Sequence, residues 1–422
     1  MSYFRVNRLI FVLLCYLACS PFSIADDILF EDDLSFDSAD QDLDSFSDSD
    51  DIFEFDDSAS KSLSGLGLKF SQKWDADPGD NWETTKHLSE LVIDLKGMLP
   101  SYGYGELQLN LQRYWPNDSN YSTDTSDTEI ERAFVQFSSD KWSSKLGKYT
   151  IGWGEIEGGA LDVINPGGSL SDPLPDSQWF MNTTRYWDSS DLSIFYNHNP
   201  GVIKIKDVSL VDDSGSEIGL RLGINNDGND TAIYFARLIP NNALKDIVNG
   251  NSKAKPYHLL GLSTNQAIDG YLIKYDLAYK RNLQHNRADK LVDTDRIDLG
   301  VALDIQQDDR QWIFSLSSQY LIDYYSDFLT PGLVQNVSTP RHSLSYSASL
   351  SDTFDDKDYK WNVATSSSSN GDMKLLSAGI DWDINDQWSA ALRGTRISAS
   401  SDRAFHLLDG YKRVGIELNY QY

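Results

Sequence analysis

The residues most able to do chemistry lie in one long segment, residues 152–182, which reads GWGEIEGGALDVINPGGSLSDPLPDSQWFMN. Carboxylates gather there beside aromatic and turn-forming residues, and the candidate site consists of Trp153, Glu155, Glu157, Asp162, Asn165 and Pro166. Carboxylates at the narrow part of a water-filled passage favour cations over anions. A structural role stays open for each, because Asp162 can cap a turn and Asn165-Pro166 can reverse the chain.

A second set of charged residues alternates with large apolar residues. In residues 271–280, YLIKYDLAYK, the odd-numbered positions are apolar or aromatic, and charged residues stand between them. The same pattern selects Arg132, Lys148, Lys274, Asp276, Arg296, Asp298, Arg393, Arg413 and Glu417. Basic and acidic side chains that face one wet passage set up an electric field across it. The alternative is that many of them pair across strands and only stiffen the wall.

Motifs for catalysis are missing from the sequence. It contains no G-x-S-x-G, H-E-x-x-H, P-loop or C-x-x-C pattern, and nothing selects a Ser/His pair from its six histidines. Both cysteines, Cys15 and Cys19, fall in an N-terminal segment that we expect to be removed, which excludes disulfides and thiolate chemistry. We therefore expect no enzyme activity, no cofactor and no metal site.

The elements that must position these residues are β-strands. Period-2 stretches repeat from residue 61 onward, separated by Gly, Asn, Asp and Ser clusters, and the prolines fall between them. No later run approaches the roughly 18 apolar residues of a membrane-spanning helix. The mean hydropathy of −0.43 fits a barrel, in which only every second strand residue is apolar. The pattern predicts an all-β fold, a transmembrane antiparallel up-and-down β-barrel of about 16–18 strands.

The connections between the predicted strands are of two kinds. Short polar turns alternate with longer loops, which we place at residues 75–86, 115–128, 152–182, 239–255, 281–294 and 323–341. An even number of strands puts both termini in the periplasm, so the short turns belong there and the long loops outside. By this count the segment 152–182 is the third long loop, the one that folds into the lumen in general porins.

The C-terminal residues, VGIELNYQY, alternate strictly up to an aromatic last residue. Leu418, Tyr420 and Tyr422 share the apolar face, which suits the closing strand of an outer-membrane barrel. The same apolar row resembles the signal that barrel-assembly machinery reads. A strand of a soluble sheet is the alternative interpretation of this stretch.

The N-terminal residues 1–25 form a predicted secretory signal peptide. Arg5 and Arg8 precede a short apolar run, and small residues follow at Ser23 and Ala25. A lipoprotein signal marked by Cys19 in YLACS is the alternative. Cleavage after Ala25 leaves an acidic segment, residues 26–60, and a barrel domain, residues 61–422.

The acidic segment 26–60 contains no Lys or Arg, and its self-repulsion predicts a disordered periplasmic tail. Large apolar residues nevertheless recur among the acids, for example Phe30, Phe36 and Phe46. Such interleaving can fold on a partner. The alternative is therefore a segment that docks to a periplasmic partner or plugs the lumen.

Residues 129–166, EIERAFVQFSSDKWSSKLGKYTIGWGEIEGGALDVINP, resemble the signature of a family of Gram-negative outer-membrane barrels distantly similar to alginate-export and porin-like proteins. The matching positions are Arg132-Ala133, Gly147-Lys148, Trp153-Gly154-Glu155, Gly158 and the stretch from Asp162 to Pro166. The chain departs from the pattern at Glu131-Arg132, at Tyr149 and at Gly167-Gly168. The resemblance implies an outer-membrane barrel, with a conduit for hydrophobic or polymeric compounds as one option, and it gives no substrate.

These features together predict an outer-membrane, porin-like channel for passive diffusion or export of solutes, in which loop 152–182 shapes the pore. The alternatives are a closed binding or adhesion barrel and a conduit that works with an exporter. The net charge of −28 makes nucleic acid an unsuitable partner. The expected partners are outer-membrane lipid and lipopolysaccharide, the assembly machinery, and a periplasmic partner of residues 26–60.

Overall fold

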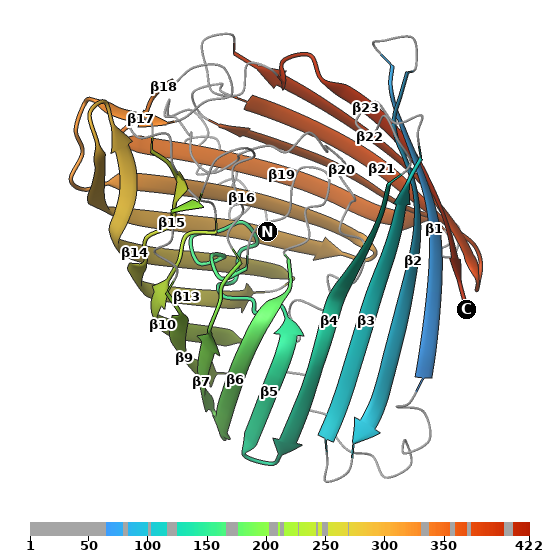
Figure 1. Cartoon of the computed structure of the whole chain (residues 1–422), viewed down its shortest axis with the longest axis horizontal. Helices are drawn as coiled ribbons and strands as arrows, with labels where there is room; N and C mark the ends of the chain where they lie inside the picture. The colour runs from blue at the N-terminus through green and yellow to red at the C-terminus, as the bar shows by residue number, and fades with distance from the viewer. Residues whose placement is uncertain are drawn as a thin grey trace, which may run out of the picture.

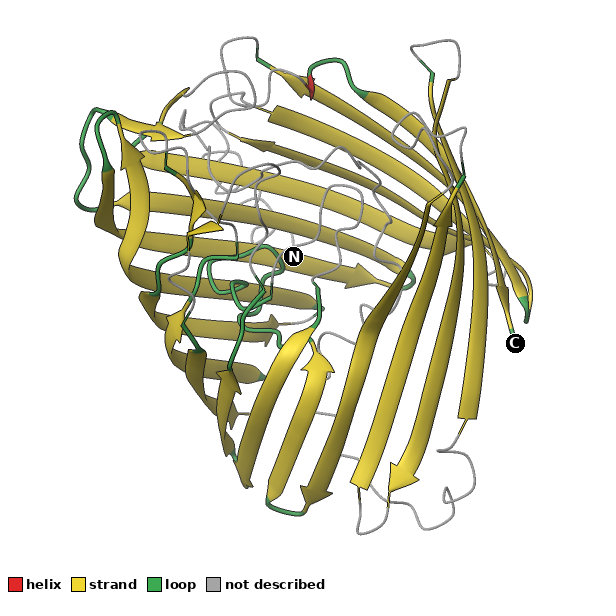
Figure 2. Cartoon of the chain, viewed as in Figure 1, coloured by secondary structure: helices red, strands yellow, loops and turns green. Residues whose placement is uncertain are grey.

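Long antiparallel strands make up most of the chain in the computed structural model (Figures 1 and 2). The structure describes residues 65–78, 83–99, 103–115, 125–165, 176–201, 210–211, 215–226, 228–241, 244–246, 252–268, 270–330, 337–354, 359–368, 373–400 and 408–422. Within these residues no helix is long and apolar enough to cross a membrane. The predicted signal peptide and the acidic segment 26–60 lie outside the described residues, so the domain boundaries stay predictions.

The strands follow one another along the chain, and the longest gap between them separates β5 from β6. The first are β1 (Gly65–Asp77), β2 (Glu83–Leu99), β3 (Gly103–Tyr114), β4 (Thr125–Ser139), β5 (Trp142–Tyr149), β6 (Gln178–Trp187), β7 (Ser190–Asn197) and β8 (Leu210–Val211). Next come β9 (Glu217–Asn226), β10 (Asn229–Leu238), β11 (Leu244–Lys245), β12 (Ser252–Lys253), β13 (Tyr257–Ile268), β14 (Tyr271–Arg287), β15 (Leu291–Gln307) and β16 (Arg310–Leu321). The last are β17 (Phe328–Thr330), β18 (Val337–Ser338), β19 (His342–Phe354), β20 (Tyr359–Ser368), β21 (Met373–Asn385), β22 (Trp388–Ala399) and β23 (Lys412–Gln421).

The main sheet closes on itself as a barrel. Each long strand pairs antiparallel with its neighbour along the chain, and β23 returns to pair with β1, with Trp74 opposite Ile416. Two backbone hydrogen bonds between Leu68 and Tyr422, of 3.3 and 2.9 Å, extend this seam to the last residue. The described sheet has 20 strands, of which the short β17 and β18 only extend a loop, so 18 strands go round the barrel. The predicted all-β barrel of about 16–18 strands is confirmed.

Alternation along the strands separates two environments. Large apolar side chains point outward, among them Leu146 and Ile416 with 57% and 55% of their surfaces exposed. Their sequence neighbours point inward and are buried, among them Ser71 and Asp298. Because successive strand residues face opposite sides of a sheet, this arrangement follows from the period-2 pattern. The outward row forms the apolar band that a bilayer requires.

Aromatic side chains gather near the strand ends. Trp388 packs on Tyr420 at the short-turn end, with ring centroids 4.9 Å apart. At the long-loop end His87 stacks between Trp74 and Trp115, with centroid distances of 5.5 and 5.4 Å. Tyr and Trp combine an apolar ring with a polar group, so they suit the two membrane interfaces.

Several predicted loops are shorter than the sequence indicated, because strands continue past the apolar band. β1 and β2 pair from Asp75–Lys86 onward to Asp77–Glu83, which leaves a short connection where we expected residues 75–86 to be loop. β14 and β15 likewise extend far into the predicted loop 281–294, past a bulge where Asn282 has a φ of 63°. These extensions are mostly polar and have no continuous outward row of large apolar residues, so the alternation that marks a membrane strand fades before the strand ends.

Candidate functional site

The connection between β5 and β6 turns into the barrel (Figure 2). Residues 150–165 of this connection are described, and they contact the inner wall on β10, β13 and β14. We call residues 150–165 the inward loop. The expected boundary at residue 182 is wrong, because Gln178–Trp187 form β6, in which Trp179 and Met181 point outward and Phe180 inward. Pro166 lies outside the described residues.

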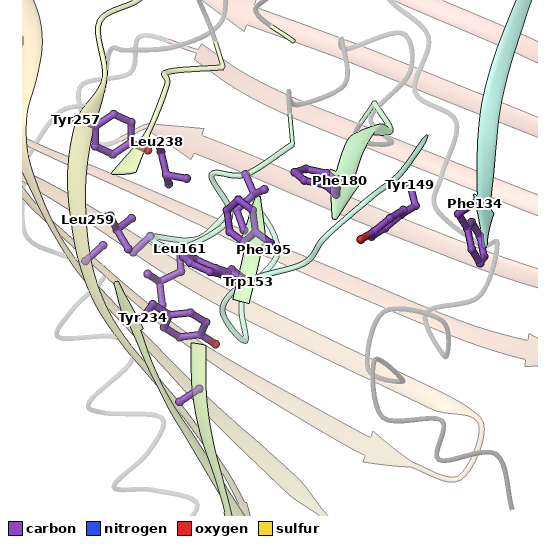
Figure 3. Close-up of a cluster of buried hydrophobic side chains, with 14 residues drawn as sticks. Phe134, Tyr149, Trp153, Leu161, Phe180, Phe195, Tyr234, Leu238, Tyr257 and Leu259 are labelled. Carbon is purple, nitrogen blue, oxygen red and sulfur yellow. The ribbon is translucent and has the colours of Figure 1, made fainter. Parts of the chain in front are cut away.

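Apolar side chains hold the inward loop against the wall (Figure 3). The Trp153 ring lies 4.9 Å from the ring of Tyr234 and 5.3 Å from that of Phe195, centroid to centroid. Trp153 is only 6% exposed, and Leu161 and Ile164 are also buried in this cluster. Trp153 therefore belongs to an apolar core inside the lumen and does not line the passage itself.

Small inward-facing residues make room for this core. A Cβ on Gly219 of β9 would lie 2.6 Å from the Trp153 ring, and one on Gly261 of β13 would lie 2.4 Å from Leu161. Heavy atoms do not approach so closely, so any larger residue at these positions would displace the loop. The wall is thus shaped for the loop, and the sequence signal is a glycine at an inward position of a strand.

Asp276 fixes the backbone of the inward loop. This fully buried carboxylate on β14 accepts hydrogen bonds from the backbone N–H groups of Glu155, at 3.0 Å, and of Ile156, at 3.2 Å. The neighbouring Gly154 N–H donates to the Tyr234 hydroxyl at 3.3 Å. Two predicted site residues, Asp276 and Glu155, are thereby brought together from distant parts of the sequence, and Asp276 acts as an anchor for the loop.

The Glu155 carboxylate is also tied to the wall. Its Oε2 accepts a hydrogen bond of 2.7 Å from Asn265 Nδ2 on β13. Asn165 closes the base of the loop, since its side-chain amide donates to the Ile151 carbonyl at 2.7 Å and accepts from the Ile151 N–H at 3.2 Å. Both residues hold the inward loop in place, which is the structural role that the sequence had left open.

Glu157 and Asp162 are the exposed acids of the inward loop. Asp162 accepts a hydrogen bond of 2.9 Å from the Gly158 N–H. Enclosure by the barrel raises the pKa of Glu157, and the charge of Asp162 raises it further, while Lys274 opposes the shift. Enclosure also raises the pKa of Asp162. Both carboxylates are accessible to water and ions in the lumen.

Most of the predicted lumen charges face inward, and many of them are paired. Lys280 and Arg296 both bind Asp298, with N–O distances of 2.7 and 2.8 Å. Arg393 lies 2.5 Å from Asp381. Other pairs are Arg413 with Asp75 and, at 3.7 Å, Arg132 with Glu106. Lys274 and Glu417 share this inward row, with Glu417 opposite Lys73 across the seam.

Lys148 is an exception, since it lies on the outward row of β5 with Leu146. Its ammonium lies 3.0 Å from the Glu129 carboxylate and 2.5 Å from the Ile130 carbonyl oxygen, near the start of β4. The prediction for Lys148 is wrong because Leu146 sets the phase of this strand, which turns odd-numbered residues inward.

Lys145 is the inward lysine of β5, and sequence reasoning missed it. Its Nζ lies 3.7 Å from the ring centroid of Phe134 and 4.5 Å from that of Tyr149. In the described part of the chain no carboxylate lies within ion-pair distance of it. The signal that would have found Lys145 is the spacing of Trp142 and Leu146 in WSSKLGKY, which marks the even-numbered residues as outward and Lys145 as inward.

The wall beyond the inward loop carries few charges and many hydroxyls. On β19 the outward Tyr346 fixes the phase, and serines occupy the inward positions around it. The inward serines of β16, β19 and β20 are Ser315, Ser317, Ser343, Ser345, Ser347, Ser349, Ser351, Ser366 and Ser368. Ser315 and Ser347 share a hydrogen bond of 2.7 Å. This face offers weak, uncharged hydrogen bonding, in contrast to the acids of the inward loop.

No protein-family model matches the sequence, and no curated protein sequence matches it. Solved barrels are nevertheless similar in structure. OccAB1 of Acinetobacter baumannii is 10% identical, with a TM-score of 0.53 over 85% of this chain and 96% of that one. OccD3 (OpdP) of Pseudomonas aeruginosa is 8% identical, with a TM-score of 0.54 over 86% and 91%. OccAB2 of A. baumannii is 12% identical, with a TM-score of 0.53 over 85% and 98%.

These neighbours are porins of Gram-negative outer membranes. At such low identity the likeness shows that this chain has the same fold. The predicted relation to alginate-export barrels and the signature of residues 129–166 are not shown by it.

Proposed function

We propose that this protein is an outer-membrane channel through which small polar solutes diffuse, and that the inward loop narrows its lumen. The observation that carries the proposal is the docking of residues 150–165 on the inner wall, where Asp276 holds the backbone and Glu157 and Asp162 face the lumen. A loop fixed to the inner wall reduces the cross-section of the passage, and the strands of the barrel keep their arrangement.

Barrel size supports an open lumen. Eight-stranded barrels fill their interior with side chains, whereas barrels of 16–18 strands leave an aqueous channel. This barrel has 18 strands and a polar inward row, so the inward loop is the structure that limits passage. The exposed acids of the loop favour cations, and the inward charge pairs around the wall supply a field across the lumen.

The location in the outer membrane rests on the surface of the barrel and on its structural neighbours. The outward apolar band and the aromatic residues at both rims suit a bilayer, and the neighbours lie in Gram-negative outer membranes. We place the short turns on the periplasmic side of this membrane and the long loops on the outer side. The proposed partners are lipid and lipopolysaccharide, the assembly machinery acting on Leu418, Tyr420 and the exposed Tyr422, and a periplasmic partner of residues 26–60.

Single-channel recording tests the proposal. The mature chain, residues 26–422, is refolded and inserted in a planar bilayer under a salt gradient. We expect stepwise, ohmic currents whose reversal potential shows that cations pass more readily than anions. A folded barrel that stays silent would overturn the channel and favour a closed binding or adhesion barrel, or a conduit that opens only with an exporter. We propose no enzyme activity, in line with neighbours that are channels.

A further inference from the structure

A cluster of two tryptophans and one arginine stands on the outer face of the barrel, away from the lumen. The Arg185 guanidinium carbon lies 5.0 Å from the ring centroid of Trp142 and 5.1 Å from that of Trp187. The two tryptophans are 45% and 46% exposed. We call these three residues the arginine–tryptophan clamp.

Strand register places the clamp at the short-turn rim. Trp142, the first residue of β5, lies directly opposite Arg185 of β6, and Trp187 ends β6 just before the turn to β7. All three side chains share the outward row with Leu146 and Met181. Arg185 is therefore at the depth of a lipid headgroup, directly below an apolar surface that contacts acyl chains.

The charge of Arg185 lies next to two aromatic rings. Among the described residues no carboxylate lies within ion-pair distance of its guanidinium. Arg310, on the outward row near another short turn, differs, because its guanidinium lies 2.6 Å from the Asp352 carboxylate. A guanidinium donates hydrogen bonds in its own plane, so contact with ring faces leaves its donors directed toward an acceptor.

We propose that the arginine–tryptophan clamp binds the phosphodiester of a glycerophospholipid in the leaflet next to the short turns. The phosphate accepts hydrogen bonds from Arg185, the indoles of Trp142 and Trp187 flank the headgroup, and the acyl chains lie along Leu146 and Met181. A phosphate is the acceptor that matches a guanidinium in geometry and charge. The proposal requires only that the barrel sits in a bilayer, and it holds whether or not the lumen conducts.

Native mass spectrometry of the full mature chain in detergent tests the clamp. Phosphatidylglycerol is titrated against the wild type, R185Q and the matched control R310Q, and diacylglycerol serves as a lipid without phosphate. Loss of a charge-assisted phosphate contact weakens binding by about tenfold or more. We expect this weakening for the tightest phosphatidylglycerol site of R185Q, wild-type affinity for R310Q, and no comparable adduct with diacylglycerol.

Three results would overturn the clamp: equal affinity of R185Q and the wild type, equal weakening in R185Q and R310Q, or equal binding of diacylglycerol. A heat-modifiability gel shows which variants are folded. If R185Q does not fold, R185K and W187F take its place. R185K keeps the charge but loses the planar donors, so its affinity for phosphatidylglycerol should lie between those expected for the wild type and R185Q. Wild-type affinity in both R185K and W187F would equally refute the site.

Discussion

Replacing Asp276 by Asn should loosen the inward loop without unfolding the barrel. The buried carboxylate accepts two backbone N–H groups, from Glu155 at 3.0 Å and from Ile156 at 3.2 Å. Asn offers one acceptor oxygen in place of two, and its NH₂ group then faces a second donor. Hydrogen bonds to a charged group contribute about 1.5–3 kcal/mol each. Losing one bond and weakening the other therefore costs about 2–4 kcal/mol of loop docking.

The apolar core opposes complete release of the loop. Trp153, Leu161 and Ile164 stay buried in the variant, and each such side chain contributes about 1.5–3 kcal/mol. The loop of D276N should thus remain docked most of the time but open more often. A change of about 2–4 kcal/mol corresponds to roughly 30- to 1,000-fold in the population of the open state.

Hydrogen exchange and current noise measure this opening. We expect the amides of Gly154, Glu155 and Ile156 to exchange at least about 30-fold faster in D276N, and the open-channel current to become noisier. D304N is the matched control, since Asp304 lies on the same wall and binds Gln311 instead of the loop. Unchanged protection of these amides in D276N, or an equal effect in D304N, would refute Asp276 as the anchor.

Three further predictions concern the charges that the lumen exposes. In E157Q combined with D162N the reversal potential in a salt gradient should lose much of its cation preference. E155Q should change the reversal potential less, because Glu155 is less exposed than these two acids and lies against the wall at Asn265. The opposite ranking would misplace the constriction. Acidification should also weaken cation preference. The pKa values of Glu157 and Asp162 are raised above their ordinary values of 4.5 and 3.8, so the loss of cation preference begins at a higher pH than for free carboxyls. A titration of reversal potential with its midpoint at or below those ordinary values would contradict the enclosure of these acids. The stability of the docked loop depends on pH in the opposite direction. A raised acid pKa favours the docked loop at low pH, and this advantage is lost as pH rises through the folded-state pKa. K145Q should increase cation preference, since it removes a lumen cation that rests on Phe134 and Tyr149, and K148Q, on the outer face, is its control.

The barrel itself could be predicted from local patterns. Whether a residue faces lipid or lumen depends on strand parity, and parity can be read wherever apolar residues mark one face, as Tyr275 and Leu277 do around Asp276. The prediction failed where the marker was weak. In WSSKLGKY only Trp142 and Leu146 set the phase, and Lys148 was assigned to the wrong face in place of Lys145. Strand ends were missed for a similar reason. Where a hairpin extends past the apolar band its residues are mostly polar, so no apolar row marks one face of the strand.

The sequence by itself determined the strand periodicity, the outward apolar band and the presence of an acidic, ordered segment after β5, because each of these depends on neighbouring residues. The tertiary structure alone decided which acids remain exposed and which become anchors. Glu155 and Asp276 are 121 residues apart, and no local pattern pairs them. Their contact exists because closure of the barrel brings β14 opposite the inward loop, and because Gly219 and Gly261 leave space there for Trp153 and Leu161. Packing of this kind depends on the shape of two surfaces that meet only after the chain has folded.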